Sequence, residues 1–142
     1  MKRLISLVLV LLMVFTGAAL AAGRVLGFTA MTMLNPFFIV IEEEVRKVVE
    51  ANGDTLITFD PAMDNARQIS QIEDAISKGV ALMFVNSADN QGIVPALLQL
   101  NAAGIPIVNY DAEVADYEKY VQAYVGSNNY NAGYVCGEDM AK

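Results

Sequence analysis

The sequence has 142 residues, with 16 acidic and 9 basic side chains and a formal net charge of −7, a balance that argues against nucleic acid and anionic membranes as partners. This length is enough for one domain with a real core and too short for two. Histidine is absent and Cys136 is the only cysteine, so the inventory excludes a zinc site, a His-based catalytic triad and an intramolecular disulfide.

The first 22 residues have the three regions of a secretory signal peptide. Two basic residues precede an uncharged run over residues 4–15, and small residues follow as far as Ala22. Cleavage is predicted after Ala21 or Ala22, which gives an exported chain without a membrane anchor. The alternative is a retained anchor, because residues 4–22 carry no charge and are just long enough to span a bilayer.

Beyond this leader, short apolar runs alternate with amphipathic segments. Strands are predicted at residues 24–30, 54–59, 80–85, 105–110 and 120–125. Helices are predicted at residues 36–52, at 64–79 and from about 93 to 103, where Pro95 makes the start of the third helix uncertain. Strands that alternate with helices form right-handed βαβ units. The predicted fold class is therefore α/β, with an open parallel sheet of about five strands and helices on both faces.

Such sheets bind ligands at the carboxyl ends of their strands, and the first candidate site follows the first strand. Its candidate residues are Asn35, Phe37 and Phe38, with Pro36 in the first helical turn. Two adjacent rings would offer a flat apolar platform, and Asn35 a donor and an acceptor, which suits a polyhydroxylated ring. The alternative is that both rings plug the end of the sheet as core residues.

Asp111 is the second candidate, because it directly follows the fourth strand and no helix cap requires it. A carboxylate accepts hydrogen bonds from two adjacent hydroxyl groups at once, as a sugar presents them. The alternative is an ordinary solvated loop acid. Asn86, Ser87 and Asp89 follow the third strand, but a helix cap and an Asx-turn explain them more simply than a ligand does.

No catalytic constellation emerges from the sequence. Glu42, Glu43 and Glu44 are adjacent acids, but consecutive helical residues fan around the axis, and the dipole stabilises acids near a helix N-terminus. Residues 29–32 contain no G-x-G turn, so the first strand lacks a dinucleotide fingerprint. We therefore expect no enzyme, no cofactor and no metal. A flavodoxin-like enzyme is the alternative from another class, disfavoured by the missing phosphate-cradling loop.

With these features laid out, the sequence resembles the periplasmic sugar-binding proteins of ABC importers, specifically the ribose and galactose type, called type I. The resemblance extends from the signal peptide to Lys142. It is carried by residues 34–38 (LNPFF), 84–89 (FVNSAD), 103–111 (AGIPIVNYD) and 125–133 (VGSNNYNAG) in this order and spacing.

The resemblance implies the sheet order 2-1-3-4-5 and ligand contacts at Asn35, Phe37, Phe38 and Asp111. It also implies a monosaccharide or polyol as ligand, the membrane permease of an ABC importer as partner, and the periplasm as location. A ligand sensor subunit of the same fold is an alternative. Ala112 departs from the pattern, because an Arg follows the acid in ribose-type members, and this departure argues against ribose itself.

Members of that family have two similar lobes joined by hinge strands, which close on the ligand. The resemblance therefore divides the chain into the signal peptide (1–22), an N-terminal lobe (23–127) and a segment (128–142) that crosses to a second lobe. Ser127 and Asn128 are the predicted hinge. The last segment is predicted to be the opening helix of that lobe, with Val135, Cys136 and Met140 facing its core, so the sequence is expected to be an N-terminal portion.

Overall fold

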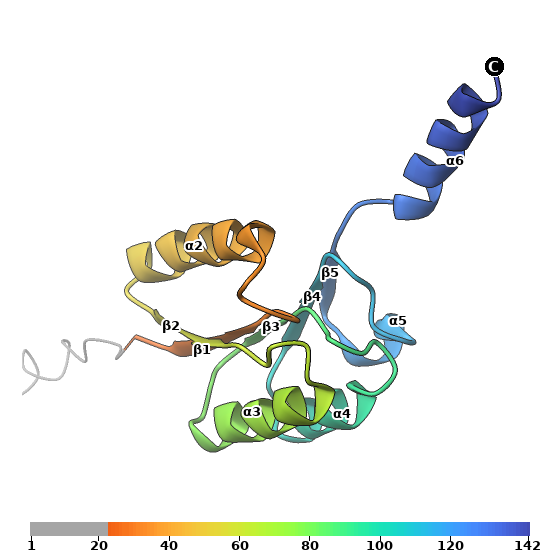
Figure 1. Cartoon of the computed structure of the whole chain (residues 1–142). Coiled ribbons are helices and arrows are strands. Elements are labelled where there is room, and N and C mark those ends of the chain that lie inside the picture. Colours follow the sequence, from red (N-terminus) through yellow and green to blue (C-terminus); the bar gives the residue numbers. More distant parts are fainter. Residues whose placement is uncertain (1–22) are drawn as a thin grey trace, which may run out of the picture.

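The computed structural model of the chain describes residues 23–142 (Figure 1). The predicted signal peptide, residues 1–22, lies outside the described residues. The strands are β1 (Val25–Thr29), β2 (Thr55–Phe59), β3 (Met83–Val85), β4 (Ile107–Tyr110) and β5 (Ala123–Val125). The helices are α2 (Pro36–Ala51), α3 (Asn65–Ser77), α4 (Val94–Ala102), α5 (Tyr117–Tyr120) and α6 (Asn129–Met140).

The five strands form one parallel sheet in the order β2-β1-β3-β4-β5. Thr29 at the end of β1 pairs with Phe59 and with Val85, and Tyr110 at the end of β4 pairs with Val125. The carboxyl ends of all five strands therefore lie along one edge of the sheet. The predicted α/β class, the parallel pairing and the order 2-1-3-4-5 are confirmed.

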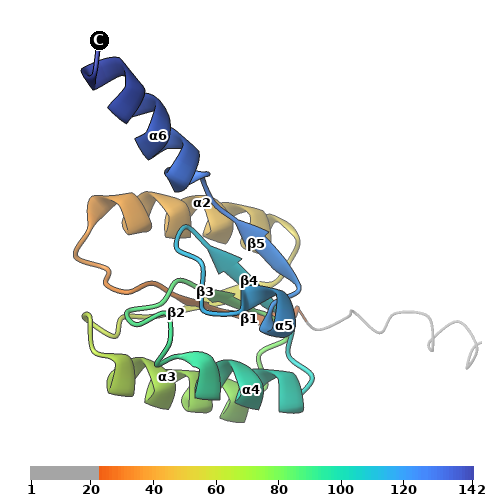
Figure 2. The ribbon, with the colours of Figure 1, turned by 90° about the vertical axis from the view of Figure 1, so that its right-hand side faces the viewer.

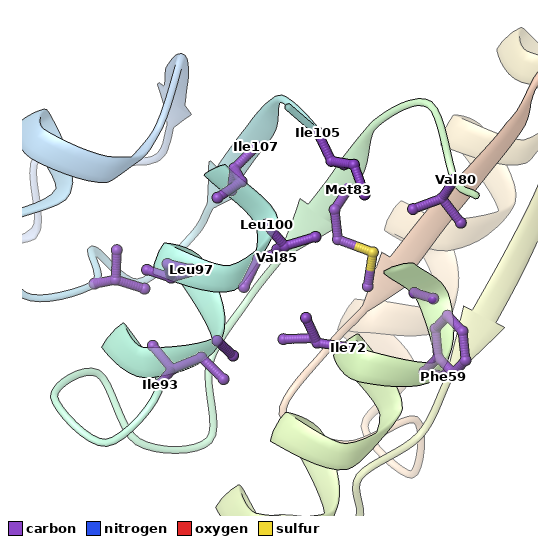
Figure 3. Packing of buried hydrophobic residues seen from close by; sticks show 13 residues of the cluster. Phe59, Ile72, Val80, Met83, Val85, Ile93, Leu97, Leu100, Ile105 and Ile107 are labelled. Atoms are coloured by element: carbon purple, nitrogen blue, oxygen red, sulfur yellow. The ribbon is translucent and has the colours of Figure 1, made fainter. Parts of the chain in front are cut away.

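Helices cover both faces of this sheet. Helix α2 lies on one face, and α3 and α4 lie side by side on the other (Figure 1, Figure 2). The larger core fills the space between the sheet and the α3–α4 pair (Figure 3). Ile72 of α3 and Leu97 and Leu100 of α4 are fully buried there. Full burial of each such side chain stabilises the fold by about 1.5 to 3 kcal/mol before entropy is counted.

The second core lies between the sheet and α2 and is built around Phe28 of β1, which is fully buried. The Phe28 ring stacks on Tyr110, with 5.2 Å between ring centroids, and is tilted against Phe84 at 6.4 Å. Phe38 and Val49 of α2 pack against this cluster from the helix side. The aromatic part of the core therefore lies directly beneath the N-terminal half of α2.

Gly27 of β1 packs against the side chain of Met83, a residue of the larger core. A Cβ atom at this position would lie 2.3 Å from Met83 Sδ. Gly27→Ala is therefore expected to lower the free energy of unfolding by about 1 to 2 kcal/mol, because overpacking forces neighbouring side chains to move. Urea denaturation measures the change. The matched control is Gly137→Ala in α6, where an added Cβ meets open space and helix propensity improves; an equal loss in both variants would contradict the packing explanation.

Several element boundaries differ from the sequence prediction by one to three residues; β4, for example, begins at Ile107 instead of residue 105. β3 begins at Met83, three residues later than predicted, because the chain bends at Ala81. The predicted fifth strand is shorter, since its first residue, Tyr120, ends the helical turn α5. The uncertainty about Pro95 is resolved, because α4 begins at Val94 and the proline lies in the first turn, where no backbone donor is needed.

The helix dipole does not explain the three adjacent acids, because none of them lies in the first turn of α2. Glu42 has a different role. Its carboxylate is buried and accepts hydrogen bonds from Arg46, Nε at 3.1 Å, and from the Thr58 hydroxyl group of β2. Burial alone would raise the pKa of Glu42, but the bonds from Arg46 and Thr58 outweigh it and the pKa is lowered. Glu42 therefore ties α2 to the edge strand of the sheet.

Helix α6 extends away from the sheet and its covering helices (Figure 1, Figure 2). None of its residues is buried, and Tyr130 and Met140 are 85% and 90% exposed. Asn128 caps it by accepting a hydrogen bond from the Asn131 amide at 2.9 Å. Within residues 23–142, no helix combines the length and the apolar character needed to cross a membrane.

Candidate functional site

The loops that follow β1, β3 and β4 meet at the carboxyl edge of the sheet, because these three strands are neighbours in parallel register. The loop after β1 carries Asn35 and leads into α2, whose first turn carries Phe37. The loop after β3 carries Asn86, and the loop after β4 carries Asp111. The structure therefore brings together residues that lie up to 76 positions apart in the sequence.

Asn35 is the N-cap of α2, and its side-chain oxygen accepts a hydrogen bond from the Phe37 amide at 3.0 Å. This bond uses the side-chain oxygen and leaves the amide nitrogen of the exposed Asn35 side chain as a donor. Pro36 at the first helical position costs no hydrogen bond. The cap and the proline together fix the first turn of α2 at the carboxyl edge of the sheet.

Phe37 and Phe38 occupy different environments. The Phe37 side chain is 53% exposed, whereas Phe38 is 3% exposed and packs edge-on against Tyr110 with 6.5 Å between ring centroids. The two phenyl rings are 69° from coplanar, so they do not form the shared flat platform expected from the sequence. Phe37 presents the apolar surface, and Phe38 supports it from the core.

Three hydrogen bonds hold Asp111, one each to its amide, its carbonyl oxygen and its carboxylate. Its amide donates to the Val125 carbonyl oxygen at 2.8 Å, and its own carbonyl oxygen accepts from the Tyr124 hydroxyl group at 2.7 Å. Asn86 Nδ2 donates to one carboxylate oxygen of Asp111 at 3.2 Å. The backbone of Asp111 is left-handed, with φ of 64°, a conformation that Asp adopts more readily than most residues. The half-buried carboxylate is therefore held in one orientation.

Two buried amide side chains connect the strand ends. The helix cap or Asx-turn expected for Asn86 is wrong, because its side chain bonds to distant segments and the N-cap of α4 is Ile93. Asn86 accepts from the Met31 amide at 3.1 Å and donates to the Tyr110 carbonyl oxygen at 3.3 Å. Gln68 of α3 donates to the Thr29 hydroxyl group at 3.0 Å and to the Asn86 carbonyl oxygen at 2.9 Å. Both residues are fully buried. A polar residue directly after an apolar strand was the available signal for Asn86, whereas Gln68 looked like any helical residue.

Asn109 makes the corresponding connection one strand further along. Its amide nitrogen donates to the Val85 and Ala112 carbonyl oxygens at 3.0 Å each, and its oxygen accepts from the Val114 amide at 3.2 Å. An asparagine within an otherwise apolar strand was the signal for this role. The loop that contains Asp111 is therefore anchored on both sides.

Tyr110 links the aromatic core to this edge. Its hydroxyl group donates to the Thr29 carbonyl oxygen at 3.1 Å. Burial, together with the negative charges of Asp111 and Glu42, raises the pKa of Tyr110 far above its ordinary value. The phenol therefore stays protonated and remains a hydrogen-bond donor at any physiological pH.

Two hollows adjoin Asp111. The larger, of about 450 Å³, is lined by residues 111–113, Tyr124 and residues 126–130. The smaller, of about 330 Å³, is lined by Phe37, Ile41, Tyr110, Asp111 and residues 125–127. Asp111, Gly126 and Ser127 belong to both hollows, and the predicted hinge residue Asn128 belongs to the larger one. Asp111 thus separates an aromatic hollow from a polar one.

The groups around Asp111 are carboxylates, amides, hydroxyl groups and aromatic rings. This set can bind a polar molecule through hydrogen bonds and can contact its apolar faces through rings. In the described part of the chain, no group of three His, Cys, Asp or Glu residues is placed to hold a metal ion.

Residues 26–142 match the family model described as a periplasmic binding protein domain. The ribose import binding protein of Bacillus subtilis (strain 168) is 32% identical over 108 residues, which cover 76% of this chain and 35% of that protein.

Solved structures that are similar to the chain include two ABC transporter solute binding proteins. An ABC transporter solute binding protein from Mycobacterium smegmatis with bound glycerol has a TM-score of 0.69 at 28% identity, covering 75% of this chain and 36% of that one. Another from Clostridium phytofermentas with bound L-rhamnose has a TM-score of 0.67 at 25% identity, covering 75% and 33%. The chain spans about a third of the length of these proteins.

Proposed function

The chain belongs to the periplasmic binding protein family, and from this membership we propose that it captures a sugar or a related polyol at the carboxyl edge of its sheet. The observation that carries the proposal is the fixed orientation of the Asp111 carboxylate between two hollows. The ligands named for the similar proteins support it, since ribose, glycerol and L-rhamnose all carry adjacent hydroxyl groups.

Each candidate residue has a separate role in this proposal. Asp111 accepts hydrogen bonds from ligand hydroxyl groups, which is the strong, charge-assisted kind of hydrogen bond. Asn35 donates from its amide nitrogen, and Phe37 contacts the apolar face of the ring. Phe38, which is 3% exposed, acts mainly by holding Phe37 and Tyr110 in place.

The proposal extends to the setting in which this lobe works. Export through the leader at residues 1–22 delivers the chain to the periplasm, where it hands its ligand to the permease of an ABC importer. Residues 128–142 cross to a second lobe, with Ser127 and Asn128 as the hinge. The exposure of every residue of α6 is consistent with a helix whose packing partner lies outside this chain.

Asp111→Asn tests the proposed contact. Because the described edge is open on one side, the chain alone is expected to bind monosaccharides with millimolar affinity, about −4 kcal/mol. Asn tolerates the left-handed backbone, so the substitution removes the charge with little strain. Losing a charge-assisted hydrogen bond is expected to weaken binding about tenfold. Titration up to about 100 mM sugar, followed by proton–nitrogen correlation NMR, measures this change.

Asp116→Asn is the matched control, because Asp116 lies in the same connection, also has a left-handed backbone with φ of 52°, and lines neither hollow. Its affinity for sugar is expected to stay within about twofold of the unmodified chain. Equal affinity in the Asp111 and Asp116 variants would remove Asp111 from the site. If no monosaccharide or polyol perturbs residues around Asp111, the proposed function is wrong.

A further inference from the structure

Tyr124 of β5 is bonded to the backbone of Asp111, the central residue of the proposed site. Its hydroxyl group donates to the Asp111 carbonyl oxygen at 2.7 Å. A phenol has a single proton to donate, so this bond uses the only donor of the side chain and leaves none for a ligand. Burial, followed by the negative charges of Glu113 and Asp111, raises the pKa of Tyr124. The phenol therefore stays protonated, and able to donate, at physiological pH.

Tyr124 and Val125 hold the two ends of the Asp111 backbone. The Asp111 amide donates to the Val125 carbonyl oxygen at 2.8 Å, and the Asp111 carbonyl oxygen accepts from Tyr124. The backbone of Asp111 is left-handed, with φ of 64°, a conformation that costs energy in residues other than glycine unless surrounding contacts maintain it. The side chain leaves from the Cα atom between these two bonded groups. A change in φ would therefore move the carboxylate.

Gly126 provides the space that this arrangement needs. A Cβ atom at position 126 would lie 2.0 Å from the Tyr124 hydroxyl oxygen and 2.8 Å from the Asp111 carbonyl oxygen. The φ angle of Gly126 lies outside the left-handed region, so the backbone conformation does not itself require glycine here. The close approach of the phenol to Asp111 is what excludes a side chain at position 126.

We propose that Tyr124 is a positioning residue: its hydroxyl group fixes the backbone of Asp111 so that the carboxylate stays between the two hollows. The inference rests on the proposed function, because it concerns the same acid. Asn86 holds the carboxylate from the end of β3 at 3.2 Å, and Tyr124 holds the main chain from β5. Because β5 leads directly to the predicted hinge residues Ser127 and Asn128, the strand that orients the acid is also the strand that leaves the lobe.

Tyr124→Phe removes the hydroxyl group and keeps the ring. In this variant the Asp111 amide is expected to exchange with solvent about threefold to tenfold faster, because one of the two bonds to the Asp111 backbone is lost. Amides of β1, two strands away from β4, are expected to keep their exchange rates. Tyr117→Phe is the matched control, since it removes the same group from the neighbouring ring, 5.4 Å from that of Tyr124, and should change neither rate. Hydrogen–deuterium exchange followed by NMR measures these rates.

Sugar binding distinguishes positioning from direct contact with the ligand. The probes are D-ribose, L-rhamnose and glycerol, the ligands named for the similar proteins, titrated up to about 100 mM on the 142-residue chain. Tyr124→Phe is expected to weaken binding about threefold. In the Asp111→Gly background, glycine tolerates the left-handed backbone and no carboxylate remains to be oriented. There the same substitution is expected to weaken binding less than about 1.5-fold, because the two effects are not independent.

Unchanged exchange of the Asp111 amide, or unchanged sugar affinity, in Tyr124→Phe would overturn the positioning role. A loss of affinity that recurs in full in the Asp111→Gly background would overturn it as well, because Tyr124 would then contact the ligand itself. If no probe binds the unmodified chain, the proposed function is wrong. The exchange rates, which require no ligand, would then still decide whether Tyr124 holds Asp111.

Discussion

Replacing Asn86 by alanine is expected to lower the free energy of unfolding by about 3 kcal/mol, because the substitution strands several buried polar groups at once. Asn86 is fully buried and joins the loop after β1 to the end of β4. Alanine leaves the Met31 amide and the Tyr110 carbonyl oxygen without this partner. Each buried group that loses its hydrogen bond costs about 1 to 3 kcal/mol.

Urea denaturation of the Asn86→Ala chain measures this loss. Asn90→Ala is the matched control in the same loop, because the Asn90 side chain is exposed, and its cost is expected to stay below about 0.5 kcal/mol. A loss of less than about 1 kcal/mol for Asn86→Ala would show that water replaces the amide and that the network is not essential to the edge.

Asn86→Asp distinguishes the acceptor role of Asn86, toward the Met31 amide, from its donor role, toward the Asp111 carboxylate. Aspartate keeps an oxygen that accepts from the Met31 amide, but it places a second carboxylate opposite Asp111 in place of the donor at 3.2 Å. Repulsion between two adjacent carboxylates raises one pKa, so this variant is expected to lose stability as pH rises through that raised pKa. If the loss in free energy of unfolding did not depend on pH, the two carboxylates would interact only weakly.

The architecture could be predicted from the sequence because its signals are local. The run at residues 80–85 is apolar, and its last three residues form β3, which has a neighbouring strand on each side in the parallel sheet. Asn52 with Gly53, and Gly104, mark helix ends at which the structure has Gly with positive φ at positions 53 and 104. The order of the strands came from the family resemblance, since periodicity alone does not say which strands are neighbours.

The geometry of the candidate site could be predicted only in part, because it depends on contacts between distant segments. Asp111 was identified from its place after a strand, but its left-handed backbone and its bond to Asn86 depend on pairing across 25 positions. The sequence gives no signal that Gln68 reaches across to the end of β1. A buried amide in a helix is recognised only when the strand ends beneath it are known.

Phe38→Ala is expected to lower the free energy of unfolding by about 3 to 4 kcal/mol, whereas Phe37→Ala is expected to cost less than about 1 kcal/mol. The reason is burial: Phe38 is 3% exposed and Phe37 53% exposed. Phe38 also contacts the Tyr110 ring edge-on, so its removal leaves a cavity in the aromatic core. Urea denaturation of the two variants under the same conditions measures both values.

Substitutions of these two residues should affect ligand binding in the reverse order, with the larger loss of affinity at Phe37. Phe37→Ala removes a ring that lines the smaller hollow, so it is expected to weaken sugar binding about threefold to tenfold, the usual worth of an aromatic contact. Phe38→Leu fills most of the core volume and is expected to keep affinity within about twofold, since Phe38 lines neither hollow. If Phe38→Leu weakened binding as much as Phe37→Ala did, while the chain remained folded, both rings would contact the ligand. The flat platform expected from the sequence would then form on binding, through a rotation of Phe38 out of the core.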